Sequence, residues 1–175
     1  PAFAKLLEKL ADGIANHLRA QIEAGAAAVQ LFDTWGGLLS QDSYRLVVLP
    51  SLQRVIASLK SAGCPVILYV NGSAPHLETM AESGAEVLSV DWRLPLSKVR
   101  QRVGDKIALQ GNLDSSILFS PPEKIVQSTR AMLTDHPGPG LIANLGHGIL
   151  PDTPVEHARA FVNTVKQFNN FPLST

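Results

Sequence analysis

Hydrophobic and polar positions follow two patterns along this chain, a helical periodicity and short apolar runs that are typical of buried strands. Apolar residues recur every three or four positions over residues 1–24, which predicts a helix or a helix pair that Gly25 ends. Short apolar runs predict five strands, over residues 26–32, 65–70, 87–90, 107–112 and 140–143. Helical spacing returns between them, over residues 42–59, 77–83, 96–103, 121–133 and 154–168, and Pro50 predicts a kink or break in the first of these helices.

Strands that alternate with helices are typical of an α/β protein with a parallel sheet built from βαβ units. No linker or repeat divides the chain, so we expect residues 1–175 to form a single domain. A complete (β/α)8 barrel needs at least ~200 residues. The fold is therefore expected to be either a small open sheet or part of a barrel.

Composition narrows the possible partners. The 15 basic and 15 acidic residues balance, which leaves no electrostatic footprint for nucleic acid or an anionic membrane. No apolar run approaches the ~20 residues that span a bilayer. Cys64 is the one cysteine and cannot form an internal disulfide, which favours an intracellular setting. The chain opens inside a helical pattern without an initiator Met, so we expect it to be part of a longer protein.

Polar residues and glycines follow every predicted strand. The segments are residues 33–37, 71–73, 91–92, 110–112 and 144–148. Ligands of α/β proteins bind at this edge of the sheet, although short βα loops are also polar because their backbone groups need partners. The last segment places His147 between Gly146 and Gly148, which are expected to adopt backbone conformations that other residues resist.

Several kinds of site find no support in the sequence. There is no G-x-G-x-x-G or Walker motif, and no pair of histidines has metal-ligand spacing. We expect four histidines to be structural or solvent-exposed, with His76 on the surface; they are His17, His76, His136 and His157. A triad of Ser73, His147 and Asp91 lacks a nucleophile elbow and is set aside. The residues alone predict an α/β enzyme fragment without an evident cofactor, in which His147 suits proton transfer.

The same strand-end segments resemble the uroporphyrinogen decarboxylase family over residues 24–168. The most specific are QLFDTWGG (residues 30–37), VDW (90–92), LQGNLD (109–114) and NLGHG (144–148). The resemblance implies a partial (β/α)8 TIM barrel of about five strands, a homodimer, and a cytoplasmic enzyme, or a plastid one in a plant or alga. It implies decarboxylation of the four acetate side chains of uroporphyrinogen to give coproporphyrinogen in haem and chlorophyll biosynthesis, with no metal and no prosthetic group.

The resemblance also implies two site residues. His147 falls on the family's active-site histidine, which contacts a substrate carboxylate, and Thr34 falls on a hydroxyl residue, usually serine, that binds one. The family's key aspartate, its carboxylate-binding arginines and its active-site tyrosine belong to an N-terminal part that is absent here. Asp33 and Asp91 match other positions of the family and receive no catalytic role. Arg93 stands where the family more often has threonine and receives no role. We expect this chain by itself to be inactive and to self-associate.

Two alternatives remain open. A zinc-dependent methyltransferase of the same barrel superfamily carries a His-x-Cys after a strand, whereas this chain has Asn71-Gly72-Ser73 there, and Cys64 precedes its strand. A non-catalytic binding or assembly module is the alternative from another functional class.

Overall fold

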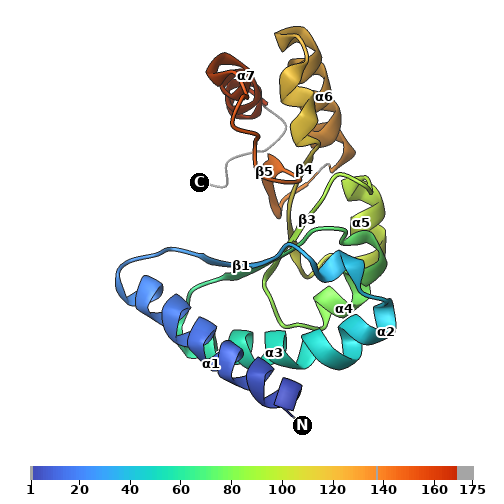
Figure 1. Ribbon diagram of the computed structural model, residues 1–175. Helices are drawn as coiled ribbons and strands as arrows, with labels where there is room; N and C mark the ends of the chain where they lie inside the picture. The colour runs from blue at the N-terminus through green and yellow to red at the C-terminus, as the bar shows by residue number, and fades with distance from the viewer. Residues whose placement is uncertain (1, 137, 169–175) are drawn as a thin grey trace. The chain divides into compact units, whose positions relative to one another are not determined.

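The computed structural model describes residues 2–136 and 138–168. It is an α/β fold in which five parallel strands form one sheet in the order β1-β2-β3-β4-β5 (Figure 1). The strands are β1 (Val29–Asp33), β2 (Val66–Val70), β3 (Val87–Val90), β4 (Ala108–Leu113) and β5 (Leu141–Leu145). The five strands predicted from the apolar runs are confirmed, with ends that differ by a few residues at most.

Helices separate the strands as the periodicity predicts. They are α1 (Ala2–Glu23), α2 (Gln41–Ser43), α3 (Leu49–Leu59), α4 (Leu77–Ala81), α5 (Leu96–Val103), α6 (Pro122–Asp135) and α7 (Val155–Lys166). The segment 1–24 is one helix, and Gly25 follows it with a left-handed φ of 105°. A π-helical turn over Tyr44–Val48 interrupts the helical segment just before Pro50, which lies in the first turn of α3. Helical residues lie on both sides of Pro50, because the Leu49 N–H donates to the Tyr44 carbonyl oxygen across the π-helical turn. A proline removes one N–H donor from such a segment, which is consistent with the irregular turn beside it.

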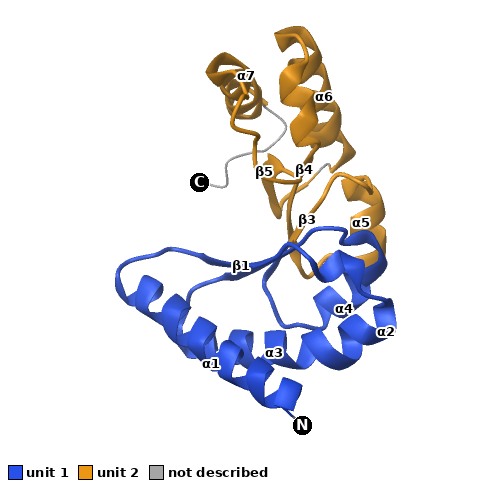
Figure 2. Cartoon of the chain, in the orientation of Figure 1, with its two compact units in different colours: residues 1–88 blue, residues 89–175 orange. Residues whose placement is uncertain are grey.

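The chain divides into two compact units, Pro1–Leu88 and Ser89–Thr175, which are described separately (Figure 2). In the first unit, β1 and β2 pair in parallel from Val29 opposite Val66 to Asp33 opposite Val70. All five residues of β2 are buried, as expected for a parallel strand covered on both faces.

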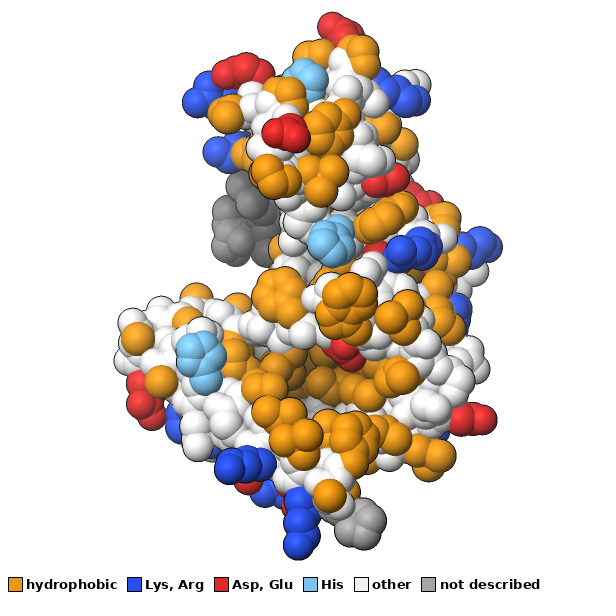
Figure 3. Space-filling view, viewed as in Figure 1, with side chains coloured by type: hydrophobic (Ala, Val, Ile, Leu, Met, Phe, Trp, Pro, Cys, Tyr) orange, Lys and Arg blue, Asp and Glu red, His pale blue; other side chains and the backbone are white. Residues whose placement is uncertain are grey.

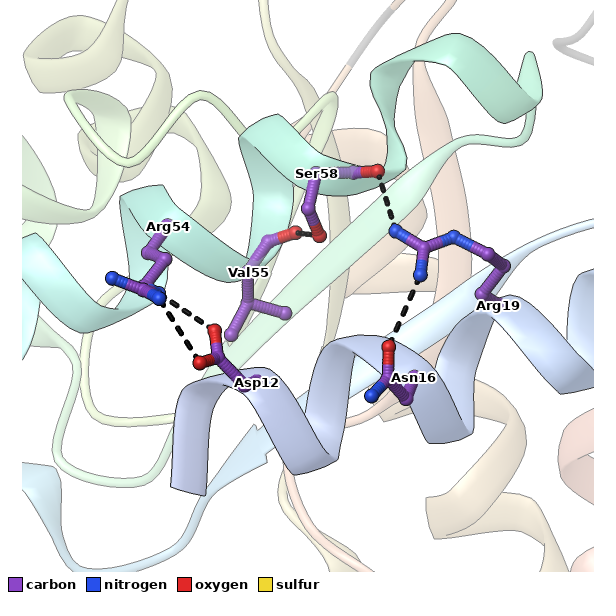
Figure 4. Close-up of polar contacts among 6 residues, drawn as sticks. All are labelled: Asp12, Asn16, Arg19, Arg54, Val55 and Ser58. Carbon is purple, nitrogen blue, oxygen red and sulfur yellow. Dashed lines mark hydrogen bonds and ion pairs between the residues drawn. The ribbon is translucent and has the colours of Figure 1, made fainter. Parts of the chain in front are cut away.

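Helix α1 packs on α3 in the first unit. The buried side chains of the two helices are Ala11, Ala15 and Leu18 of α1, and Leu49, Val55, Ile56 and Leu59 of α3. At the surface, Arg54 Nε donates to Asp12 Oδ1 at 2.7 Å, and Arg19 Nη2 donates to the Ser58 carbonyl oxygen at 3.2 Å (Figure 4). These contacts join two helices whose apolar faces are already packed, and an exposed ion pair such as Arg54–Asp12 adds little to stability.

In the second unit, β4 and β5 pair in parallel from Leu109 opposite Leu141 to Leu113 opposite Leu145. Helix α6 packs on α7. His157 of α7 lies with Nδ1 2.6 Å from the Leu118 carbonyl oxygen, which is consistent with the structural role expected for this histidine.

Exposed apolar side chains gather in the first unit. Phe3, Leu6, Leu10 and Ile14 of α1 recur at helical spacing and are all exposed. Figure 3 shows hydrophobic side chains collected on one face of this unit. Among the described residues, no helix has the length and the run of apolar residues that crossing a membrane requires.

Candidate functional site

The loop that follows β1 is held by the Asp33 carboxylate and by main-chain hydrogen bonds. Asp33 ends the strand, and its Oδ1 accepts the Gly36 N–H at 2.7 Å. Its carbonyl oxygen accepts the Asn71 N–H at 3.1 Å, and Gly37 N–H donates to the Asn71 carbonyl oxygen at 3.1 Å. The loops after β1 and β2 are therefore tied together. Thr34 lies in the first of them, exposed to solvent immediately after the carboxyl end of β1.

A buried aromatic pair lies behind this loop. The rings of Tyr44 and His76 stack with centroids 4.4 Å apart and an interplanar angle of 25°. His76 is only 1% exposed, so the prediction that it lies on the surface is wrong. Its two ring nitrogens have no hydrogen-bond partner among the described residues. His76 ends the short helix Ala74–His76, which is separated from β2 by residues 71–73.

Burial and one carboxylate set the charge state of this pair. Burial lowers the pKa of His76, and the nearby Asp33 carboxylate offsets part of that effect. Burial raises the pKa of the Tyr44 phenol far above its ordinary value, and Asp33 raises it further. At neutral pH the pair is therefore a neutral imidazole stacked on a neutral phenol.

A second cluster, in the second unit, follows β3. The Asp91 side chain is fully buried, and Arg93 Nη1 donates to its Oδ2 at 2.5 Å. The Arg93 backbone N–H donates to Asp91 Oδ1 at 3.1 Å. The guanidinium also lies over the Trp92 ring, with its carbon 4.8 Å from the ring centroid. A buried carboxylate is thus neutralised by a half-exposed arginine.

The polar residues of β4 serve the interior of this unit. Asn112 is buried, and its Nδ2 donates to the carbonyl oxygens of Asp91 and Leu94 at 2.8 and 2.7 Å. Gln110 Nε2 donates to Ser89 Oγ at 3.0 Å, and both residues are buried. For Asn112 and Gln110, the explanation that strand-end polar residues satisfy internal partners holds.

His147 lies exposed just beyond the carboxyl end of β5, with Nδ1 3.4 Å from the Gly148 carbonyl oxygen. Gly146 N–H donates to the Leu113 carbonyl oxygen at 2.7 Å. The expectation that Gly146 and Gly148 adopt unusual backbone conformations is wrong, because neither has a positive φ. A Cβ at Gly146 would lie 2.7 Å from the Trp92 backbone nitrogen, whereas a Cβ at Gly148 would meet nothing within 4 Å. Close approach of two loops, and not backbone freedom, requires the glycine at 146.

The two residues expected to bind substrate, Thr34 and His147, are both exposed, each directly after a strand of its own unit. A hydroxyl and an imidazole can both donate hydrogen bonds to a carboxylate.

No cluster of three or more His, Cys, Asp or Glu side chains suited to a metal ion occurs in residues 2–136 and 138–168. Sequence reasoning assigned no role to Tyr44, His76 or Arg93, whose contacts depend on residues of other elements or on the fold of a loop.

Comparison with known proteins gives the same family as the resemblance of the strand-end segments. Residues 1–168 match the family model described as uroporphyrinogen decarboxylase (URO-D). A protein named uroporphyrinogen decarboxylase from Saccharophagus degradans is 44% identical over 173 residues, which are 96% of this chain and 49% of that protein. The proteins of the same name from Pelobacter propionicus and Magnetococcus marinus are 45% and 46% identical over 168 residues, covering 95% and 93% of this chain and 49% and 47% of theirs.

The chain spans about half the length of the curated relatives it matches. The match favours the decarboxylase over the zinc-dependent methyltransferase, since both the family model and the relatives carry the decarboxylase name. It extends across nearly the whole chain, strand-end segments included. On this evidence the chain belongs to the uroporphyrinogen decarboxylase family.

Proposed function

We propose that this chain supplies part of the active site of a carboxy-lyase that converts uroporphyrinogen to coproporphyrinogen. The observation that carries the proposal is the family match over residues 1–168. The resemblance of the strand-end segments implies that His147 and Thr34, which lie within these residues, bind substrate carboxylates. Both side chains are exposed at strand ends, where a ligand can reach them.

The chemistry needs few groups from the protein. Each of four steps converts R–CH2–CO2⁻ and one proton to R–CH3 and CO2. The electrons of the broken C–C bond pass into the pyrrole ring and return as the new methyl C–H bond forms. The resemblance implies no metal and no prosthetic group. His147 and Thr34 would bind and orient carboxylates, and an imidazole is a side chain that can transfer a proton in such a reaction.

The proposed site is incomplete in this chain. Uroporphyrinogen carries eight carboxylates, which require cationic partners. The strand-end segments contain almost no lysine or arginine. We therefore propose that the remaining cations and the key aspartate come from outside residues 1–175, that the assembled enzyme is a cytoplasmic homodimer, and that the isolated chain is inactive.

The experiment compares two samples, the polypeptide encoded by the natural gene and residues 1–175 alone. Each is incubated anaerobically with uroporphyrinogen, and the products are oxidised and separated by chromatography with fluorescence detection. We expect coproporphyrinogen from the first sample. If the gene encodes more than these residues, the second should give none. A rate for residues 1–175 equal to that of a longer product would contradict the partial site.

Variants then test the two residues. His147→Gln should lower the rate at least tenfold, and His17→Gln, which changes an exposed histidine of α1, is the matched control and should leave the rate unchanged. Thr34→Ser keeps the hydroxyl and should retain activity, whereas Thr34→Val should raise KM. Absence of coproporphyrinogen from the folded natural product would overturn the proposed function.

A further inference from the structure

The loops that follow β3, β4 and β5 all lie in the second unit and carry one lysine or arginine between them. Residues 91–95, 114–121 and 146–154 contain Arg93 and no other basic residue apart from His147. The side chain of Arg93 is 49% exposed, although its partner Asp91 is fully buried. The cation therefore faces solvent at the carboxyl edge of the strands.

Arg93 is also held in place. One end of its guanidinium donates to Asp91, and its flat face lies on Trp92. A guanidinium has five N–H donors in a rigid plane and can serve more than one acceptor at once. A cation fixed in this way loses little side-chain entropy when it binds a second carboxylate.

The position of Arg93 relates it to His147. Gly146 lies so close to Trp92 that a Cβ at position 146 would be 2.7 Å from the Trp92 backbone nitrogen and 3.0 Å from the Trp92 ring. His147 is the next residue. Trp92 is therefore in contact with the glycine beside His147 and also with the Arg93 guanidinium.

We propose that Arg93 is a substrate-binding residue that takes a carboxylate of the acidic tetrapyrrole beside His147 and, in the same position, cancels the charge of Asp91. The inference rests on the proposed function, and it adds a cation that the family resemblance does not assign. Without Arg93, an ionised Asp91 would lack the cation that faces it and would repel an anionic ligand.

The two roles of Arg93 require a design that separates them. Arg93→Gln alone removes the cation beside the buried Asp91 and can unfold the unit. The test therefore starts from Asp91→Asn, which removes the buried charge, and adds Arg93→Gln in that background. Lys98→Gln on α5 removes one exposed positive charge of the same unit and serves as the control. Urea unfolding checks that all variants are folded.

The probe is uroporphyrin, the stable oxidised octacarboxylate, whose binding is followed by fluorescence without turnover. The protein is the polypeptide encoded by the natural gene. We expect Arg93→Gln to raise the uroporphyrin Kd at least tenfold relative to Asp91→Asn alone, as for loss of a charge-assisted hydrogen bond. The Lys98→Gln control should change Kd less than twofold. Arg93→Lys in the same background should recover part of the affinity.

A Kd within twofold in the presence and absence of Arg93 would overturn the inference, as would failure of the unsubstituted protein to bind uroporphyrin. Turnover by the unsubstituted protein is measured separately. If the unsubstituted protein turns over uroporphyrinogen but the Kd does not depend on Arg93, the proposed function is retained and only the substrate-binding role of Arg93 is refuted. If the unsubstituted protein shows no turnover, the proposed function is refuted. A Kd that depends on Arg93 would then still support a carboxylate-binding role for Arg93.

Discussion

The close contact between Gly146 and Trp92 makes a direct prediction about stability. Gly146→Ala would place a Cβ 2.7 Å from the Trp92 backbone nitrogen, 3.0 Å from its ring and 3.1 Å from the Asp91 carbonyl carbon. Two of these neighbours are backbone atoms, which cannot move aside as a flexible side chain does. Gly148→Ala, two residues on, meets nothing within 4 Å and is the matched control.

The two substitutions should change the free energy of unfolding in opposite directions. Overpacking costs roughly 1–3 kcal/mol. Replacing glycine by alanine also restricts the unfolded chain, which stabilises the protein by about 0.4–1 kcal/mol where φ is accessible. Since neither glycine has a positive φ, that gain applies to both. Gly146→Ala should therefore lower the free energy of unfolding by about 1–2 kcal/mol, and Gly148→Ala should raise it slightly.

The assay is urea unfolding followed by tryptophan fluorescence. The chain has two tryptophans, one in each unit, and a Trp35→Phe background leaves Trp92 as the reporter of the second unit. With a slope of roughly 2 kcal/mol/M, Gly146→Ala should lower the midpoint by about 0.5–1 M. The slopes must agree among variants for the comparison to hold.

The reasoning would be refuted by equal midpoints for the two variants, or by Gly148→Ala being the less stable. Either result would mean that the loops after β3 and β5 do not meet at Gly146. It would also remove the contact that connects Trp92, and therefore Arg93, with His147.

Two further predictions concern the first unit. His76 has a lowered pKa in the folded state, so the unfolded chain binds its proton first as the pH falls. Stability should be full above pH ~6.5 and fall below it by at most about 1.4 kcal/mol per pH unit. Urea unfolding between pH 5 and 8 should show a flatter profile for His76→Phe than for the exposed control His17→Gln, and parallel profiles would contradict the assignment. The exposed apolar stripe of α1 predicts that residues 1–175 self-associate, and Leu6→Lys with Leu10→Lys should weaken this. Light scattering that finds a monomer at high concentration before any substitution would refute it.

Much of the fold follows from local patterns. Apolar runs such as residues 66–70 and 87–90 are short and bounded by turn residues, so they can be predicted as strands without knowledge of tertiary contacts. Helix ends at Gly25 and Gly104 follow from glycine's access to left-handed φ values. The prediction of a single domain stays a prediction.

The candidate site could be predicted only in part. His147 and Thr34 come from motif resemblance, and the structure finds both exposed at strand ends. The roles of Asn112 and Gln110 could not be read from sequence, since a polar residue at a strand end serves a ligand or an internal partner equally well. Asn112 is turned inward by carbonyl groups of the loop after β3, about twenty residues earlier in the chain.

The amino-acid sequence by itself determined the order of helices and strands and the family, because periodicity and motifs are properties of neighbouring residues. Tertiary structure alone decided that His76 stacks on Tyr44 inside the first unit, and that Gly146 must lack a side chain. Each of these depends on the distance between residues 30 or more positions apart in the chain. Burial and close approach arise only when the packed strands and helices bring such residues together.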